Sequence, residues 1–303
     1  MIVQPMFYFM ASSLMFDKSA SISLIAHDAG SANLLTHFFI GINTQPAKVF
    51  MVGPAQKIWE NYYPDMLISN SIKEAVSGCS IVITGTGWQT DIEHEARILA
   101  KNMDIYSIAC LDHWVNYEER FNRYNEIILP DEIWVFDKHA LDLARNFFPD
   151  INILLEKNYY IHNMLQSAKN YTAPQIPEIL YLTEPIKDNW GRGTDGELQA
   201  LDYFLENIGK LGLPTKYNLV LRLHPSENSN KYLSLLQSKN VKFRLDISTE
   251  VAESISRSLW VVGCQTFALV LALQFKKTVY SSLPPHAPKS TLPFKEIINI
   301  KDL

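Results

Sequence analysis

The chain has 303 residues, of which 47% are hydrophobic and 19% are charged, and its formal net charge is −5. This composition is typical of a globular protein long enough for two domains of about 150 residues each. The slight acidity argues against nucleic acid as a partner, because phosphate backbones are bound by basic surfaces. Cys79, Cys110 and Cys264 lie singly in apolar segments, which predicts buried, reduced thiols in a cytoplasmic protein and argues against a zinc site.

The first sixteen residues, MIVQPMFYFMASSLMF, are apolar but are interrupted by Pro5 and two serines. They lack the positive charges that begin a secretory signal, and they are too short to span a membrane. We interpret them as an extension or a first strand that could touch a membrane surface. The expected location is therefore the cytoplasm, with peripheral contact at the inner membrane left open.

The first half of the chain alternates apolar strands with amphipathic helices. The predicted strands are Ile22–Ala26, Ala47–Val52, Ser80–Thr84, Asp104–Leu111 and Glu132–Phe136, and the predicted helices begin near Ala32 and cover Ala55–Tyr63, Ile92–Asn102 and Lys138–Phe147. This alternation predicts a parallel, doubly wound sheet.

Three of these strands end in polar or glycine-containing turns. Because the carboxyl ends of parallel strands share one edge, where ligands bind in open α/β sheets, these turns predict a ligand-binding site. Asp28 is expected to be either a helix cap or a carboxylate that points into the site. A single glycine, Gly30, stands where a dinucleotide fingerprint needs three. The candidate residues are His27, Asp28, Gly30, Ser31, Gly87, Trp88, Asp91, Asp112 and His113.

The second half repeats this pattern after a proline-containing linker at Asn170–Pro177. We place the boundary so that residues 1–172 form one domain and residues 173–303 the other. The predicted strands are Glu178–Leu182, Leu219–Leu223, Lys242–Leu245, Leu259–Gly263 and Lys277–Tyr280, and the predicted helices are Glu197–Lys210, Asn230–Lys239, Thr249–Arg257 and Phe267–Leu273. The predicted fold class is α/β, with two Rossmann-like, doubly wound domains that face a cleft.

The stretch YNLVLRLHPSE places His224 and Pro225 at the end of a buried strand. Pro225 biases the backbone of His224 towards an extended conformation, which fixes the direction of the imidazole. Thr183 ends another strand, and Thr266 begins an apolar helix whose first N–H groups favour an anion. A histidine that donates a hydrogen bond to a departing phosphate needs no metal. No DxD-like metal-binding sequence is visible.

Three segments of the second half carry a resemblance to a known family. ILYLTEP at Ile179–Pro185, RLHP at Arg222–Pro225 and GCQTFALVLAL at Gly263–Leu273 resemble the nucleotide-binding half of bacterial GT-B glycosyltransferases of the sialyltransferase type. Similar patterns occur in transferases of Kdo and in CDP-polyol phosphotransferases. The resemblance implies that His224 and Thr266 hold the phosphate of a cytidine nucleotide. It also implies a nucleotide site lined by Thr183, Glu184, Pro185, Arg222, Pro225 and Gln265.

The resemblance covers about the last 120 residues, and this sequence departs from the family in two places. The Asp/Glu-Asp-Gly motif that supplies the base in sialyltransferases has Asp28-Ala29-Gly30 as its nearest match, and the expected Ser-Thr or Ser-Ser pair is Gln265-Thr266. We therefore expect Asp28 to be the catalytic base, followed in preference by Asp112 and then by Asp91 or Glu93.

The resemblance implies an inverting glycosyltransferase that uses a nucleotide sugar and no metal or further cofactor. The implied donor is a CMP-activated acidic sugar, either a sialic-acid-like nonulosonate or Kdo. The implied acceptor is an oligosaccharide or a lipid-linked glycan of a capsule or lipopolysaccharide. Two enzymatic alternatives stay open, a CDP-polyol phosphotransferase and a UDP-sugar epimerase or hydrolase of GT-B-like fold. A third alternative is a non-catalytic glycan- or nucleotide-binding subunit of capsule assembly.

Overall fold

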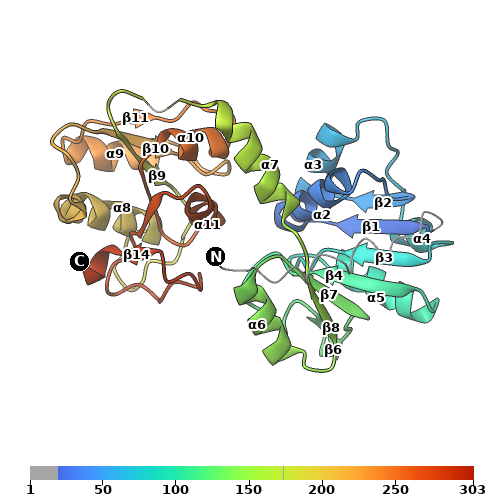
Figure 1. Ribbon diagram of the computed structural model, residues 1–303. Helices are drawn as coiled ribbons and strands as arrows, with labels where there is room; N and C mark the ends of the chain where they lie inside the picture. Colours follow the sequence, from blue (N-terminus) through green and yellow to red (C-terminus); the bar gives the residue numbers. More distant parts are fainter. Residues whose placement is uncertain (1–19, 173) are drawn as a thin grey trace, which may run out of the picture. The chain divides into compact units, whose positions relative to one another are not determined.

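The computed structural model describes residues 20–172 and 174–303 as two compact units (Figure 1). The first unit ends at Tyr160, and the second is Ile161–Leu303. The division falls within helix α7 (Tyr159–Ser167), whereas the sequence placed it between residues 172 and 173. The apolar segment at residues 1–16 lies outside the described residues.

The first unit is built on a six-stranded parallel sheet with the order β2-β1-β3-β4-β7-β8. Its strands are β1 (Ile22–Ala26), β2 (Lys48–Met51), β3 (Ile81–Thr84), β4 (Tyr106–Cys110), β7 (Glu132–Val135) and β8 (Asn152–Leu155). Its helices are α2 (Ala29–Gly41), α3 (Pro54–Tyr62), α4 (Ile72–Val76), α5 (Ile92–Asn102) and α6 (Lys138–Phe147). A separate antiparallel hairpin joins β5 (Asn122–Arg123) to β6 (Glu126–Ile127).

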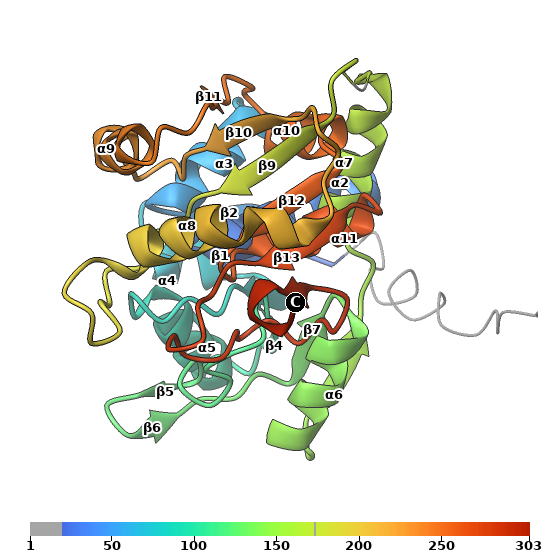
Figure 2. The ribbon, with the colours of Figure 1, turned by 90° about the vertical axis from the view of Figure 1, so that its left-hand side faces the viewer.

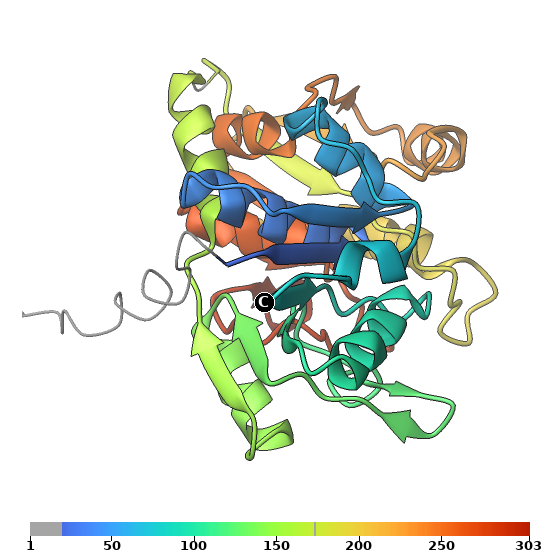
Figure 3. The same ribbon diagram turned by 90° about the vertical axis from the view of Figure 1, so that its right-hand side faces the viewer.

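Successive residues of β1 pack on opposite faces of this sheet, as the two-residue period of a strand requires. Leu24 belongs to a core cluster with Phe38 of α2 and Trp59 of α3, whereas Ile25 packs in a second cluster with Ala96 of α5. Figure 3 shows α4 and α5, coloured teal, over the face of the sheet turned to the viewer. Helices therefore cover both faces, which explains why β1 is buried along its whole length.

The second unit is also built on a six-stranded parallel sheet, with the order β11-β10-β9-β12-β13-β14. Its strands are β9 (Glu178–Leu182), β10 (Asn218–Arg222), β11 (Arg244–Leu245), β12 (Trp260–Gly263), β13 (Thr278–Ser281) and β14 (Ile298–Asn299). Its further helices are η1 (Ala168–Asn170), α8 (Gly196–Asn207), η2 (Ile208–Leu211), α9 (Asn230–Ser238), α10 (Val251–Arg257), α11 (Phe267–Gln274) and η3 (Ile300–Asp302). Helices α8 and α9 lie over one face, and α10 and α11 over the other (Figure 2).

Both sheets confirm the predicted class of two Rossmann-like, doubly wound units. Counted along the chain, the strands of the second sheet have the spatial order 3-2-1-4-5-6 that is typical of a dinucleotide-binding fold.

Three details of the sequence prediction were wrong. Helix α2 begins at Ala29 and not near Ala32, because the side chain of Asp28 caps the helix three residues earlier. The second sheet continues past β13 to β14, a two-residue strand that is too short to show a period. The first sheet gains β8, whose short sequence NILL lies between a helix and a turn.

Each sheet has one point at which the strand order reverses. In the first sheet this point lies between β1 and β3, and in the second it lies between β9 and β12. Open α/β sheets bind ligands at the carboxyl ends of the strands beside such a point. A ligand site is therefore expected at the segments that begin at His27, Gly85, Thr183 and Cys264.

The three cysteines are buried and unpaired, as the sequence predicted. Within residues 20–172 and 174–303, none of the helices combines the length and the apolar character needed to cross a membrane.

Truncation of Leu24 to alanine is expected to destabilise the first unit. The side chain is fully buried at the centre of β1, so its loss removes apolar contacts and leaves a cavity that costs about 2–5 kcal/mol. The measurement is the urea midpoint followed by tryptophan fluorescence. Leu67→Ala is the matched control because that side chain is 89% exposed, and equal midpoints for the two variants would contradict the packing described.

Candidate functional site

Asp28 lies directly after β1 and has two roles in the structure. Its Oδ1 accepts hydrogen bonds from the backbone N–H and the hydroxyl of Ser31, both at 2.9 Å, and so caps α2. Its Oδ2 is buried and has no hydrogen-bond partner among the described residues. The structure confirms the interpretation of Asp28 as a helix cap, and Oδ2 is the oxygen that a role as a site carboxylate would use.

Glu93, in the first turn of α5, approaches Asp28 from the neighbouring strand end. It is fully buried, and its Oε1 accepts the backbone N–H of His27 at 2.9 Å. A Cβ atom placed on Gly87 would lie 2.8 Å from Oδ2 of Asp28 and 3.1 and 3.4 Å from the two oxygens of Glu93. The two carboxyl groups thus pack closely against Gly87, where a side chain would collide with them.

Asp112, which follows β4, approaches Asp28 from another side. A Cβ atom on Gly30 would lie 2.1 Å from Oδ2 of Asp112 and 3.3 Å from Oδ1 of Asp28. We call Asp28, Glu93 and Asp112 the carboxyl cluster.

Burial dominates the protonation of this cluster. It raises the pKa of Glu93 to about 7, and the negative charge of Asp28 adds to the effect. The pKa of Asp112 is likewise raised to about 7 by burial and by Asp28, although Arg120 opposes this shift. Near neutral pH, Glu93 and Asp112 can therefore each hold or release a proton beside Asp28.

Two buried arginines, which the sequence analysis did not single out, hold the loops around the cluster. Arg120 donates from Nη1 to Oδ1 of Asp112 at 2.8 Å and to the carbonyl of Thr86 at 3.1 Å. Arg97, only 1% exposed, donates to the carbonyl of Gly85 at 3.3 Å. Burial lowers the pKa of Arg97 to about 10. In the sequence, each of these arginines is a charged residue inside a helical or aromatic segment. Hydrophobic periodicity alone does not place such a residue beside the strand ends.

His113 is neutral near neutral pH, because burial and then the charge of Arg120 lower its pKa to about 4. Its Nδ1 accepts the backbone N–H of Trp114 at 3.0 Å. The proton of the neutral ring is therefore on Nε2. His113 stands next to Asp112, so it is placed to donate one hydrogen bond at the edge of the carboxyl cluster.

The remaining candidates in this unit lie at the periphery. Asp91 is the N-terminal cap residue of α5, but its side chain pairs with Arg123 at 3.2 Å and accepts the hydroxyl of Tyr124 at 2.8 Å. Trp88 is 54% exposed. The core of the site is therefore the carboxyl cluster with His27, Ser31 and the two glycines.

In the second unit, Thr183 and His224 are joined at the ends of β9 and β10. The hydroxyl oxygen of Thr183 accepts the backbone N–H of His224 at 2.8 Å. Nδ1 of the imidazole accepts the N–H of Ser226 at 3.2 Å and lies 2.8 Å from its hydroxyl. The neutral ring therefore carries its proton on Nε2, and because the side chain is exposed, that N–H is available to a ligand.

Glu184 bridges the point where the strand order reverses. Its Oε2 accepts the backbone N–H of Gln265 at 2.9 Å, and burial raises its pKa. Thr266 caps α11 by accepting the N–H of Ala268 at 3.4 Å. Glu184 therefore occupies the N–H of Gln265, and Thr266 occupies that of Ala268.

A network that the sequence did not reveal lies beneath Thr183. Glu227 accepts hydrogen bonds from Lys231 and Tyr232 and also bonds to the side chain of Thr183. Lys231 pairs in addition with Glu197 at 2.6 Å. This network fixes the hydroxyl that orients the backbone of His224, so it is a positioning element of the candidate nucleotide site.

Arg222 and Pro225 complete the expected nucleotide residues. The guanidinium of Arg222 pairs with Asp246 at 2.6 Å and donates to the carbonyl groups of Ser248 and Thr249. It thereby holds the loop after β11. Pro225 is exposed beside His224, as is Pro185 beside Glu184.

No protein-family model and no curated protein matches this chain. The UDP-GlcNAc 2-epimerase of Neisseria meningitidis, solved with UDP-GlcNAc bound, aligns with a TM-score of 0.60 and 14% identity over 86% of this chain and 82% of its own. The corresponding epimerase of Methanocaldococcus jannaschii gives 0.56 and 12% over 86% and 83%.

The shared property is the fold. This chain has the GT-B-like fold of two Rossmann-like units. An α/β-galactoside α-2,3-sialyltransferase from Photobacterium phosphoreum aligns less closely, with a TM-score of 0.49 and 11% identity over 94% of this chain and 100% of its own. At 14% and 12% identity, the two epimerases show a similarity of fold alone.

Replacement of Glu93 by glutamine is expected to change the pH dependence of stability. The folded-state pKa near 7 lies above the ordinary value of 4.5, so the folded state binds the extra proton. The free energy of unfolding should consequently fall as the pH rises from about 4.5 to about 7, by on the order of 3 kcal/mol. Glu93→Gln removes this contribution.

The measurement is urea denaturation across that pH interval, with Glu95→Gln as the control because Glu95 is exposed on the same helix. An identical pH dependence for wild type and Glu93→Gln would show that Glu93 does not retain its proton in the folded state.

Proposed function

We propose that this protein is an inverting glycosyltransferase that uses a nucleotide sugar and no metal ion, with Asp28 as the base. The supporting observation is the buried Oδ2 of Asp28, which no described residue hydrogen bonds, at the reversal point of the first sheet. An acceptor hydroxyl that donates to this oxygen would satisfy it. Gly30 and Gly87 let the three carboxyl groups lie closer to the backbone than a side chain at either position would allow.

In the proposed reaction, Asp28 takes the proton of the acceptor hydroxyl while the hydroxyl oxygen forms a bond to the anomeric carbon of the donor. The bond between that carbon and the phosphate oxygen breaks, and the leaving nucleotide keeps the electron pair. His224 donates from Nε2 to the leaving phosphate, and the positive end of the α11 dipole at Thr266 favours the negative charge that develops there. A single in-line displacement inverts the anomeric configuration.

The proposed donor is a CMP-activated acidic sugar, sialic-acid-like or Kdo. This choice rests on the resemblance of the segments around Thr183, His224 and Thr266. The proposed acceptor is an oligosaccharide or lipid-linked glycan of a surface polysaccharide. His27, Ser31 and His113 would orient it, while Glu184 and Gln265 would line the nucleotide side.

A nucleotide-sugar epimerase is the second candidate, and the protonation of the carboxyl cluster favours it. Such an enzyme both removes and returns protons on the sugar, and Glu93 and Asp112, with pKa values of about 7 beside Asp28, provide groups for both directions. The two candidates differ in their need for an acceptor. Conversion of the sugar nucleotide without an acceptor would support the epimerase.

Asp28→Asn is expected to lower kcat by about 10²–10⁴-fold, the usual effect of losing a general base. Asparagine retains an oxygen that can cap α2, so the fold should persist. The assay is release of nucleotide from CMP-sialic acid, CMP-Kdo and UDP-GlcNAc, each with and without a glycan acceptor. Asp137→Asn is the matched control because Asp137 caps α6 in the same way. Full activity of the Asp28 variant would show that another group is the base, and no activity in the wild-type protein would favour a non-catalytic binding protein.

His224→Ala is expected to weaken nucleotide binding by about 1–3 kcal/mol, the range for a lost hydrogen bond to a charged group. The measurement is calorimetric titration with CMP, CDP, UDP and GDP. His162→Ala, an exposed histidine in the same unit, is the control. Preference for CMP would support the transferase, and preference for UDP would support the epimerase. Binding of none of the four would reject His224 as a nucleotide ligand.

A further inference from the structure

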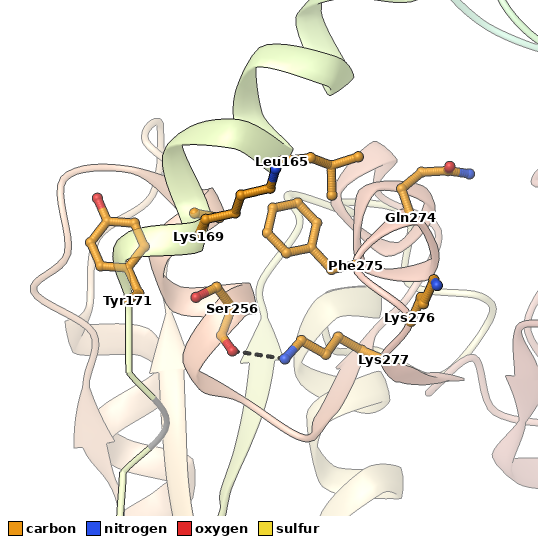
Figure 4. A pocket seen from close by; sticks show the side chains of 9 residues that line it. Leu165, Lys169, Tyr171, Ser256, Gln274, Phe275, Lys276 and Lys277 are labelled. Carbon is orange, nitrogen blue, oxygen red and sulfur yellow. Dashed lines mark hydrogen bonds between the residues drawn. The ribbon is translucent and has the colours of Figure 1, made fainter.

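The second unit contains a cavity of about 310 Å³ that is distinct from the candidate nucleotide site (Figure 4). It lies where α7 and η1 meet the carboxyl ends of α10 and α11, and its wall includes Phe275, the residue that ends α11. Thr266 begins the same helix. The cavity and the candidate phosphate site therefore lie at opposite ends of α11.

Three lysines, Lys169, Lys276 and Lys277, contribute to the wall of this cavity. Among its described lining residues there is no aspartate or glutamate. The protein as a whole has a net charge of −5, so this positive cluster contrasts with the charge of the chain. A cation at a helix end is favoured by the helix dipole, which accounts for one lysine beside α11 but not for three around one cavity.

Lys277 is the most constrained of the three. Its ammonium group donates to the carbonyl of Ser256, near the end of α10, at 2.7 Å. Partial burial lowers its pKa, and no carboxylate contributes to the shift. The charge is thus partly removed from water and balanced by one carbonyl oxygen, so an anion in the cavity would stabilise it.

Lys276 occupies a backbone position that favours glycine. Its φ is 56°, in the left-handed region that commonly ends a helix and that a side chain adopts at a cost. The side chain is exposed. A lysine at this position adds a second positively charged residue to the wall of the cavity, although glycine would adopt this backbone conformation at a lower cost.

The rest of the wall is largely apolar. Figure 4 shows the ring of Phe275 between the side chains of Lys169 and Lys277, with Leu165 of α7 above it. Lysine ammonium groups bind phosphate as point charges, and the aromatic and aliphatic surface suits a hydrocarbon group. The cavity therefore combines the recognition chemistry of an anion with that of an apolar chain.

We propose that this cavity binds a phosphate ester that carries an apolar substituent. The phosphate lies among Lys169, Lys276 and Lys277, and the substituent lies against Phe275 and Leu165. This chemistry is shared by the headgroup region of an anionic phospholipid and by a soluble alkyl phosphate. The experiment distinguishes an anionic phospholipid from a soluble alkyl phosphate.

The test uses the full-length protein and two probes. Hexyl phosphate is titrated by calorimetry, and vesicles of phosphatidylcholine with or without phosphatidylglycerol are tested by co-sedimentation. Lys169→Gln/Lys276→Gln should weaken binding roughly tenfold or more, and added salt should weaken the wild type. Lys277 is left in place because it holds the end of α10. The matched control is Lys216→Gln/Lys295→Gln, which removes the same charge from exposed positions of this unit.

Lys276→Gly is a second variant that should keep the fold, because glycine readily adopts the left-handed backbone conformation. It should bind more weakly than wild type while unfolding at the same or a higher temperature. Binding to hexyl phosphate supports a soluble ligand, and binding confined to phosphatidylglycerol vesicles supports a membrane lipid. Failure to bind either probe, or equal loss in the control variant, would overturn the proposal.

Discussion

The unequal use of the two oxygens of Asp28 is the constraint on which the rest of the first unit depends. Oδ1 is engaged by Ser31 as the cap of α2, which locks the carboxylate at the end of β1. Oδ2 consequently has a fixed direction and points to the space beside Gly87. The same contact that starts the helix thus presents a charged group at a defined position, without the rotamer freedom that an uncapped aspartate would have.

Both units follow the same design at the point where the strand order reverses. In the first, Glu93 crosses from α5 to the segment after β1. In the second, Glu184 crosses from the end of β9 to the N–H of Gln265. A buried carboxylate therefore ties the two central strand ends together in each sheet, and each leaves neighbouring groups open to a ligand. We therefore propose different roles for the two units, because the first has carboxyl groups at its strand ends and the second has an exposed imidazole there.

Much of the fold could be predicted from the sequence, because buried parallel strands such as Ile22–Ala26 and Glu178–Leu182 are continuous apolar runs that end in polar turns. The position of Asp28 at a strand end was visible for the same reason. The partnership of His27 with Glu93 was not, since 66 residues separate them and no local pattern records that contact. The structural roles of Arg120 and Lys231 could not be predicted either, because a charged side chain is ordinarily expected at the surface.

Gly87 has a consequence for how this protein could vary. Its backbone does not need glycine for its φ, so the missing side chain serves the space between Asp28 and Glu93 alone. An added methyl group would stand 2.8 Å from Oδ2 of Asp28 and 3.1 Å from Oε1 of Glu93, so at least one of the two carboxyl groups would have to move. Alanine at this position would therefore disturb the carboxyl cluster directly, without touching the candidate nucleotide residues of the second unit.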